Sequence, residues 1–114
     1  MFQNIKRIIM LINKGNAYKD GDIISFKLVN GDEIVAKLAE IIPDGYVITK
    51  PCTVMPTQQG MGLIQTMLAG DINSNITLER RHIIMHCPAV DRIQDSYIQI
   101  TTGIHPVSKG GILK

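Results

Sequence analysis

Apolar residues alternate with other residues on both sides of an Asn-Gly pair, and this pattern constrains the fold more than any other feature. Such alternation is typical of two β-strands that each bury one face. The buried positions would be Ile24, Phe26 and Leu28 on the first arm and Ile34, Ala36 and Leu38 on the second.

The length of the turn decides the register of this hairpin. A two-residue turn at Asn30-Gly31 would place Phe26 opposite Val35 and mix the two faces. A three-residue loop, Val29-Asn30-Gly31, places Phe26 opposite Ile34 and leaves one apolar face. The sequence therefore predicts a three-residue bulged loop with Gly31 in the left-handed region.

The composition indicates one globular domain. Of the 114 residues, 45% are apolar and 19% are charged, and the net charge of +2 permits contact with a polyanion without predicting it. Cys52 and Cys87 are predicted to be reduced thiols, as in a cytoplasmic protein. The longest apolar run, Ile8 to Ile12, is far shorter than the ~20 residues that span a bilayer, so no membrane partner is expected.

Further strands and two helices follow from the pattern. Residues 1–22 predict a helix and a polar linker, residues 23–104 a β-barrel with a C-terminal helix, and residues 105–114 a flexible tail. After the hairpin we expect strands at Tyr46–Lys50, with a bulge or an edge at Pro51 and Cys52–Met55 as the continuation, at Met61–Leu68, and in the β-rich segments on either side of Glu79-Arg80-Arg81. The helix after Pro88 rests on four apolar residues at helical spacing and on Gly103 as its end, the four being Val90, Ile93, Tyr97 and Ile100. The fold predicted is mainly β: a small, strongly bent antiparallel barrel of five strands with a helix at each end.

The hairpin also resembles a known family. Leu28-Val29-Asn30-Gly31 followed by Ile34, Ala36 and Leu38 is similar to the first motif of the Sm-like proteins (the LSm and Hfq families), with Ala36 in place of a glycine. From Gly21 to Ile104 the layout looks like the small Sm-like proteins of tailed phages, especially those of cyanobacteria. The resemblance implies a homo-oligomeric ring that binds single-stranded RNA, in the host cytoplasm if the protein is of phage origin.

The resemblance also implies a site. The nearest match to the second family motif is Leu68-Ala69-Gly70-Asp71, which has alanine where the family has a base-stacking arginine. The RNA-binding residues implied are Asp44, Gly70, Asp71 and Asn73 for base edges, with Arg80 and Arg81 for phosphates. The other interpretation of the two arginines is a solvated turn paired with Glu79. The corresponding alternative function is a structural or protein-interaction ring without nucleic acid.

The other groups of reactive side chains predict neither a metal site nor catalysis. His82 and His86 would lie ~13 Å apart along a strand at ~3.3 Å per residue, too far to share a metal ion. The sequence has no recognisable Ser-His-Asp or Cys-His arrangement for nucleophilic catalysis. We therefore expect a binding protein, not an enzyme, with neither metal nor cofactor. Ring assembly is predicted through the fourth and fifth strands, around Leu63–Leu68 and Ile76–Leu78. The methionines Met55, Met61 and Met67 are interpreted as core and subunit interface, with an adaptable binding surface as the alternative.

Overall fold

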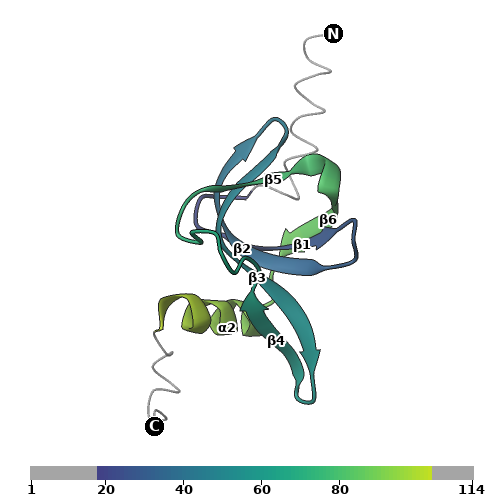
Figure 1. Ribbon diagram of the computed structural model, residues 1–114, viewed down its shortest axis with the longest axis vertical. Coiled ribbons are helices and arrows are strands. Elements are labelled where there is room, and N and C mark those ends of the chain that lie inside the picture. The colour runs from purple at the N-terminus through teal and green to yellow at the C-terminus, as the bar shows by residue number, and fades with distance from the viewer. Residues whose placement is uncertain (1–17, 104–114) are drawn as a thin grey trace.

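The computed structural model describes residues 18–103, which form an antiparallel sheet and one helix (Figure 1). The helix predicted within residues 1–22 and the tail predicted at residues 105–114 fall outside the described residues, apart from the linker residues 18–22. The elements in chain order are β1 (Ile23–Leu28), β2 (Glu33–Ile42), β3 (Gly45–Thr57), β4 (Gly60–Gln65), β5 (Ile76–Glu79), the 3₁₀ turn η1 (Arg80–His82), β6 (Ile83–Pro88) and α2 (Asp91–Thr102).

The hairpin of β1 and β2 has the predicted register. Phe26 lies opposite Ile34 and Ile24 lies opposite Ala36. Gly31 has a φ of +97° and donates its amide to the carbonyl of Leu28 over 2.9 Å. The prediction of a three-residue loop is confirmed, since only this loop length brings both apolar rows onto one face.

The predicted five-stranded barrel is wrong in two respects. In the described part of the chain the sheet has six strands, because η1 divides the segment after Ile76 into β5 and β6, which pair with different partners. The strand order is β4-β3-β2-β1-β6, and among the described strands β5 pairs only with β3, so the sheet formed by residues 18–103 does not close. The peptide of His82 ties η1 to the hairpin loop, because its carbonyl accepts the amide of Val29 over 2.9 Å.

Strand β3 runs from Gly45 to Thr57, slightly beyond the predicted Tyr46–Met55, and pairs with two further strands. Its first half pairs with β5, from Gly45 opposite Glu79 to Ile48 opposite Ile76, and its second half pairs with β4. The predicted irregularity at Pro51 is confirmed: the register with β2 shifts between Val35 and Lys37, and Lys50 has a φ of +52°. The strand continues through this bulge, as the continuation at Cys52–Met55 predicted.

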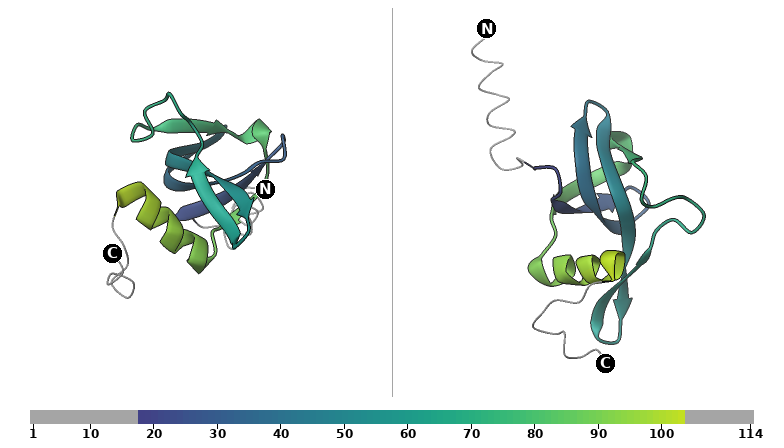
Figure 2. Two further views of the ribbon diagram at one scale, coloured as in Figure 1. Left: turned by 60° about the horizontal axis from the view of Figure 1, so that its bottom comes forward. Right: turned by 90° about the vertical axis from the view of Figure 1, so that its left-hand side faces the viewer.

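Two apolar layers stabilise the fold on opposite faces of the bent sheet. The inner layer gathers the alternating residues of the hairpin with two residues of β3. Its buried members are Ile24, Phe26, Ile34, Ala36, Leu38, Tyr46 and Ile48. The outer layer lies under α2 and consists of Val35, Cys52, Ala89, Ile93 and Tyr97. The hairpin thus buries one face in the inner layer and contributes Val35 from its other face to the layer under α2, which lies beside the sheet in Figure 2.

The C-terminal helix forms where its periodicity predicts. Ile93 and Tyr97 are buried, and Gly103, with a φ of +75°, donates to the carbonyl of Gln99 to end the helix. The Tyr97 hydroxyl reaches the bulge of β3: it accepts the amide of Lys37 at 3.0 Å and lies 3.1 and 2.9 Å from the carbonyl oxygens of Thr49 and Lys50. One buried side chain therefore holds the helix, β2 and the bulge together.

The three methionines that were interpreted as core and interface residues lie at the surface. Met55, Met61 and Met67 are exposed, so they are not core residues.

Cys52 is buried and Cys87 is exposed, and both are free thiols as predicted. Within residues 18–103, no helix has the length and apolar character needed to cross a membrane.

Candidate nucleic-acid interface

The turn between β2 and β3 meets the end of β5 at one edge of the sheet. The amide of Arg80 donates to the carbonyl of Asp44 over 2.7 Å, which fixes the start of η1 against this turn. Gly45 opposes Glu79 at the same level, and the absence of a Cβ there allows the two backbones to approach closely. The side chains of the turn and of η1 therefore share one edge.

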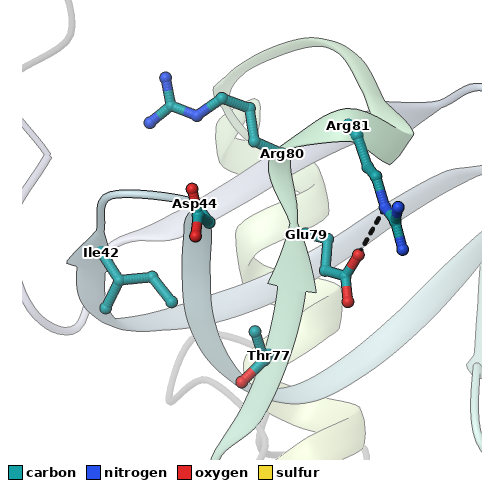
Figure 3. A pocket seen from close by; sticks show the side chains of 6 residues that line it. All are labelled: Ile42, Asp44, Thr77, Glu79, Arg80 and Arg81. Atoms are coloured by element: carbon teal, nitrogen blue, oxygen red, sulfur yellow. Dashed lines mark hydrogen bonds and ion pairs between the residues drawn. The ribbon is translucent and has the colours of Figure 1, made fainter.

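These side chains line an open groove of about 640 Å³ (Figure 3). A groove of this size lies within the range of ~300–1,000 Å³ that is typical of ligand sites. The lining residues are Ile42, Asp44, Thr77, Glu79, Arg80 and Arg81. Both signs of charge are present, together with one apolar side chain.

The two arginines of this groove differ in their pairing. Arg81 donates Nε–H to a carboxylate oxygen of Glu79 over 2.7 Å, and His82 lies 3.7 Å from the same oxygen. Within residues 18–103, the guanidinium of Arg80 has neither an ion pair nor a hydrogen bond. Figure 3 shows it directed away from Arg81 and toward the side of Asp44. The interpretation as a paired turn fits Arg81, whereas Arg80 retains a guanidinium that can contact an anion.

The other three predicted site residues lie elsewhere. Gly70, Asp71 and Asn73 belong to the loop before β5, at the end of that strand far from Arg80. Asp71 organises the loop: its carboxylate accepts the amide of Asn73 at 3.0 Å, and its carbonyl accepts the hydroxyl of Ser74 at 2.6 Å. The structure therefore unites Asp44, Arg80 and Arg81 and does not bring the remaining three to the same groove within one chain.

Sequence reasoning missed half of the groove. Ile42, Thr77 and Glu79 line it because β5 pairs with the first half of β3, a contact between segments distant in sequence. The only sequence signal was the charged stretch beside Ile76-Thr77-Leu78, which marks the residues without indicating their neighbour.

His86 forms a separate polar cluster inside the sheet. Its Nδ1 lies 2.7 Å from the Tyr18 hydroxyl, and its Nε2 lies 3.1 Å from the Tyr46 hydroxyl. A neutral imidazole has one donor and one acceptor, so one tyrosine donates to it and the other accepts. Among the described residues, no group of three histidine, cysteine or acidic side chains could hold a metal ion. The two hydrogen bonds of His86 connect β6 to Tyr18, before β1, and to Tyr46 in β3.

The protein is expected to lose stability as His86 becomes protonated. Burial lowers the pKa of His86 below its ordinary value of 6.5, and the positive charge of Arg80 adds to this effect. Burial also raises the pKa of Tyr18 to about 12, so Tyr18 stays neutral near His86. Because the unfolded chain binds the proton more tightly, the free energy of unfolding gains a contribution that is fully present above pH 6.5 and is lost as the pH falls through the folded pKa.

Thermal melts between pH 8 and pH 5 measure this contribution. Wild type should lose more stability on acidification than His86→Gln, in which the titrating group is absent. His82→Gln is the matched control, because His82 is half-exposed in η1. The interpretation fails if His86→Gln and wild type show the same pH dependence.

The chain matches no protein-family model and no curated protein. The groove and the open strand edges are therefore interpreted from their own geometry.

Proposed function

We propose that the protein is an Sm-like, ring-forming binding protein whose ligand is single-stranded RNA. The unpaired guanidinium of Arg80 at the rim of the groove carries the RNA part of this proposal. The assembly part rests on the unclosed sheet, in which strands with open edges flank η1.

Open edges favour association between copies. Among the strands of residues 18–103, β5 pairs only with β3 and β6 pairs only with β1, so each has one edge without a partner strand in this part of the chain. On β6 the side chains of Ile84 and Met85 are 54% and 63% exposed. In place of the contact predicted from the sequence between Leu63–Leu68 and Ile76–Leu78, the ring contact proposed is between β5 of one copy and β6 of the next, a heterologous contact that closes into a ring when the rotation permits. It would also cover edges that soluble proteins protect.

A ring strengthens the case for phosphate binding. Each copy adds one Arg80 and one groove at an equivalent position, and the fields of these charges sum over the assembly. Guanidinium groups bind phosphate oxygens through two parallel hydrogen bonds. A strand of RNA that follows the ring would meet Arg80 repeatedly, although the net charge per chain is only +2.

Binding of a labelled oligo(U) at several salt concentrations tests the RNA proposal. Arg80→Ala should weaken binding roughly 5- to 10-fold, since an interaction of about 1–1.4 kcal/mol changes affinity by that factor. It should also flatten the slope of log affinity against log salt by about 0.7 for each phosphate that Arg80 neutralises in the wild type. Lys37→Ala is the matched control, because it removes the same charge from an exposed position of β2 outside the groove. Equal effects of the two substitutions, or no binding at low salt, would contradict the proposal.

A structural ring without nucleic acid is the second candidate, and the placement of the aromatic side chains favours it. Bases stack on exposed aromatic rings in many single-strand binders. Here Phe26, Tyr46 and Tyr97 are buried, and Tyr18 is bound to His86, so residues 18–103 offer no exposed aromatic ring. A discrete multimer that binds no oligo(U) at any salt concentration would favour this function.

A further inference from the structure

Strands β3 and β4 form a two-stranded ribbon that extends beyond the rest of the sheet (Figures 1 and 2). Pairing between β2 and β3 reaches only as far as Thr53, so Val54–Thr57 pair with β4 alone. One face of the ribbon contacts the layer under α2 through Val54 and Leu63. An isolated two-stranded hairpin is marginally stable in water, so the outer part of the ribbon lacks the neighbours that normally stabilise a sheet.

The ribbon carries no charge. Between Lys50 and Asp71 the sequence has no Asp, Glu, Lys, Arg or His, although 19% of the chain is charged. Met55, Met61 and Ile64 are 40%, 47% and 51% exposed. Monomeric proteins usually protect an edge strand with a charge or a proline, and β4 has neither. An uncharged edge of this kind is typical of an interface.

The backbone of β4 presents its free groups in a symmetric order. The amide of Thr66 donates inward to the carbonyl of Pro51 over 3.1 Å. Since inward and outward groups alternate along a strand, the amides and carbonyls of Met61, Leu63 and Gln65 point outward. Leu63 lies midway between the other two. The outward donors and acceptors of residues 61 and 65 are thus equally spaced about Leu63. A rotation of 180° about Leu63 therefore places them opposite the same groups of an identical strand.

We propose that β4 pairs antiparallel with β4 of a second copy of this chain, about a two-fold axis at Leu63. Leu63 then opposes Leu63 of the other copy, and Met61 opposes Gln65. The outward N–H and C=O groups of these three residues then face those of the other copy. Each opposed pair exchanges two backbone hydrogen bonds, because outward groups recur at every second position. The two ribbons become one four-stranded sheet, and the isologous contact adds a two-fold axis to whatever ring the other edges form.

The chemistry of the edge selects a second copy over other partners. A nucleic acid needs cations for its phosphates and rings for its bases, and residues 51–70 contain neither cationic nor aromatic side chains. A charged peptide would place its charges against an uncharged surface and lose solvation without compensation. Within residues 18–103, the other open edges are β5, which includes the charged Glu79, and β6, which ends at Pro88 and is assigned above to the ring contact with β5, so β4 is the edge left for a second β4.

Cysteine cross-linking of the full chain tests the register. Opposed residues in a hydrogen-bonded pair have Cα atoms about 5.5 Å apart, which a disulfide can bridge. In a Cys87→Ser background, which removes the exposed native thiol, Leu63→Cys should form a covalent dimer under mild oxidation. Met61→Cys and Gln65→Cys should each stay monomeric by non-reducing gel alone but cross-link when mixed. Gln59→Cys, in the turn of the ribbon, is the control and should not cross-link.

Light scattering measures the particle mass of protein that has not been cross-linked. It distinguishes the pairing of β4 with β4 from the ring contact between β5 and β6. Gln65→Lys places a charge beside the axis and should halve the particle mass, whereas Gln59→Lys should leave it unchanged. A multimer whose mass Gln65→Lys does not alter overturns the pairing of β4 and leaves the ring proposal standing. Dimers that become monomers support the pairing and overturn the ring. A folded Leu63→Cys protein that does not cross-link, together with an unreactive 61/65 mixture, overturns the inference.

Discussion

Replacing Gly45 with alanine is expected to lower the free energy of unfolding by about 3 kcal/mol or more, the upper part of the range for overpacking. A Cβ at this position would lie 2.1 Å from the carbonyl oxygen of Leu78 and 3.0 Å from the amide nitrogen of Arg80. Both are backbone atoms, which cannot turn away as a flexible side chain can. The substitution should therefore separate β5 from β3 and displace Arg80 from the groove.

Urea denaturation, with oligo(U) binding as a second readout, measures the effect. Gly60→Ala is the matched control: Gly60 has a φ of +121°, but a Cβ there meets nothing within 4 Å. The control bears only the conformational strain, about 1–3 kcal/mol for a residue in a poor backbone region. If Gly45→Ala is no less stable than Gly60→Ala, the close approach of β3 and β5 is wrong.

Tyr97→Phe is expected to cost about 2–4 kcal/mol, since an unsatisfied buried donor costs ~1–3 kcal/mol and the missing hydrogen bond adds ~1 kcal/mol. The hydroxyl is the partner of the Lys37 amide and contacts the carbonyls of Thr49 and Lys50. The side chain is only 2% exposed, so water cannot replace it without a rearrangement. Thermal and chemical unfolding of the full chain would measure this decrease in stability.

Tyr46→Phe makes the same chemical change at a site where, among residues 18–103, the hydroxyl has one partner, Nε2 of His86. It should destabilise the protein by less than Tyr97→Phe. Lys50→Gly offers a second comparison, because glycine adopts the φ of +52° without strain and should recover part of the stability in the Tyr97→Phe background. Equal destabilisation in the two tyrosine variants would show that Tyr97 does not hold the bulge.

Local patterns predicted the local structure. The alternation around Asn30-Gly31 was enough for the register of β1 and β2, and the spacing of Ile93 and Tyr97 was enough for α2, because in both cases the interacting residues are near in sequence. The separation of β5 from β6 was not predictable in this way. It depends on β5 meeting β3 and on β6 meeting β1, contacts that no alternation pattern specifies.

The candidate site was likewise predictable in its local sequence features and unpredictable in its contacts between distant segments. The Arg80-Arg81 pair was visible in the sequence, but their different roles depend on which one Glu79 binds. The loop containing Asp71 was expected beside Asp44 because the family resemblance implied it. In this fold the length of β5 separates them, since Asp44 adjoins the last residue of that strand and the loop precedes its first.

The pairing of β1 with β6 also has a consequence for how the chain folds during synthesis. The hairpin partner of β1 follows within a few residues, whereas the strand that covers its other edge, with Pro88 opposite Ile24, is made much later. Contacts between distant segments form slowly because closing the intervening loop costs entropy. Until residues 83–102 leave the ribosome, Val35 and Cys52 also lack their helix, so the nascent chain exposes an apolar face and an unpaired strand edge together. Such intermediates are prone to aggregation, so the interval before residues 83–102 are translated is the one in which we expect the chain to be most prone to aggregate.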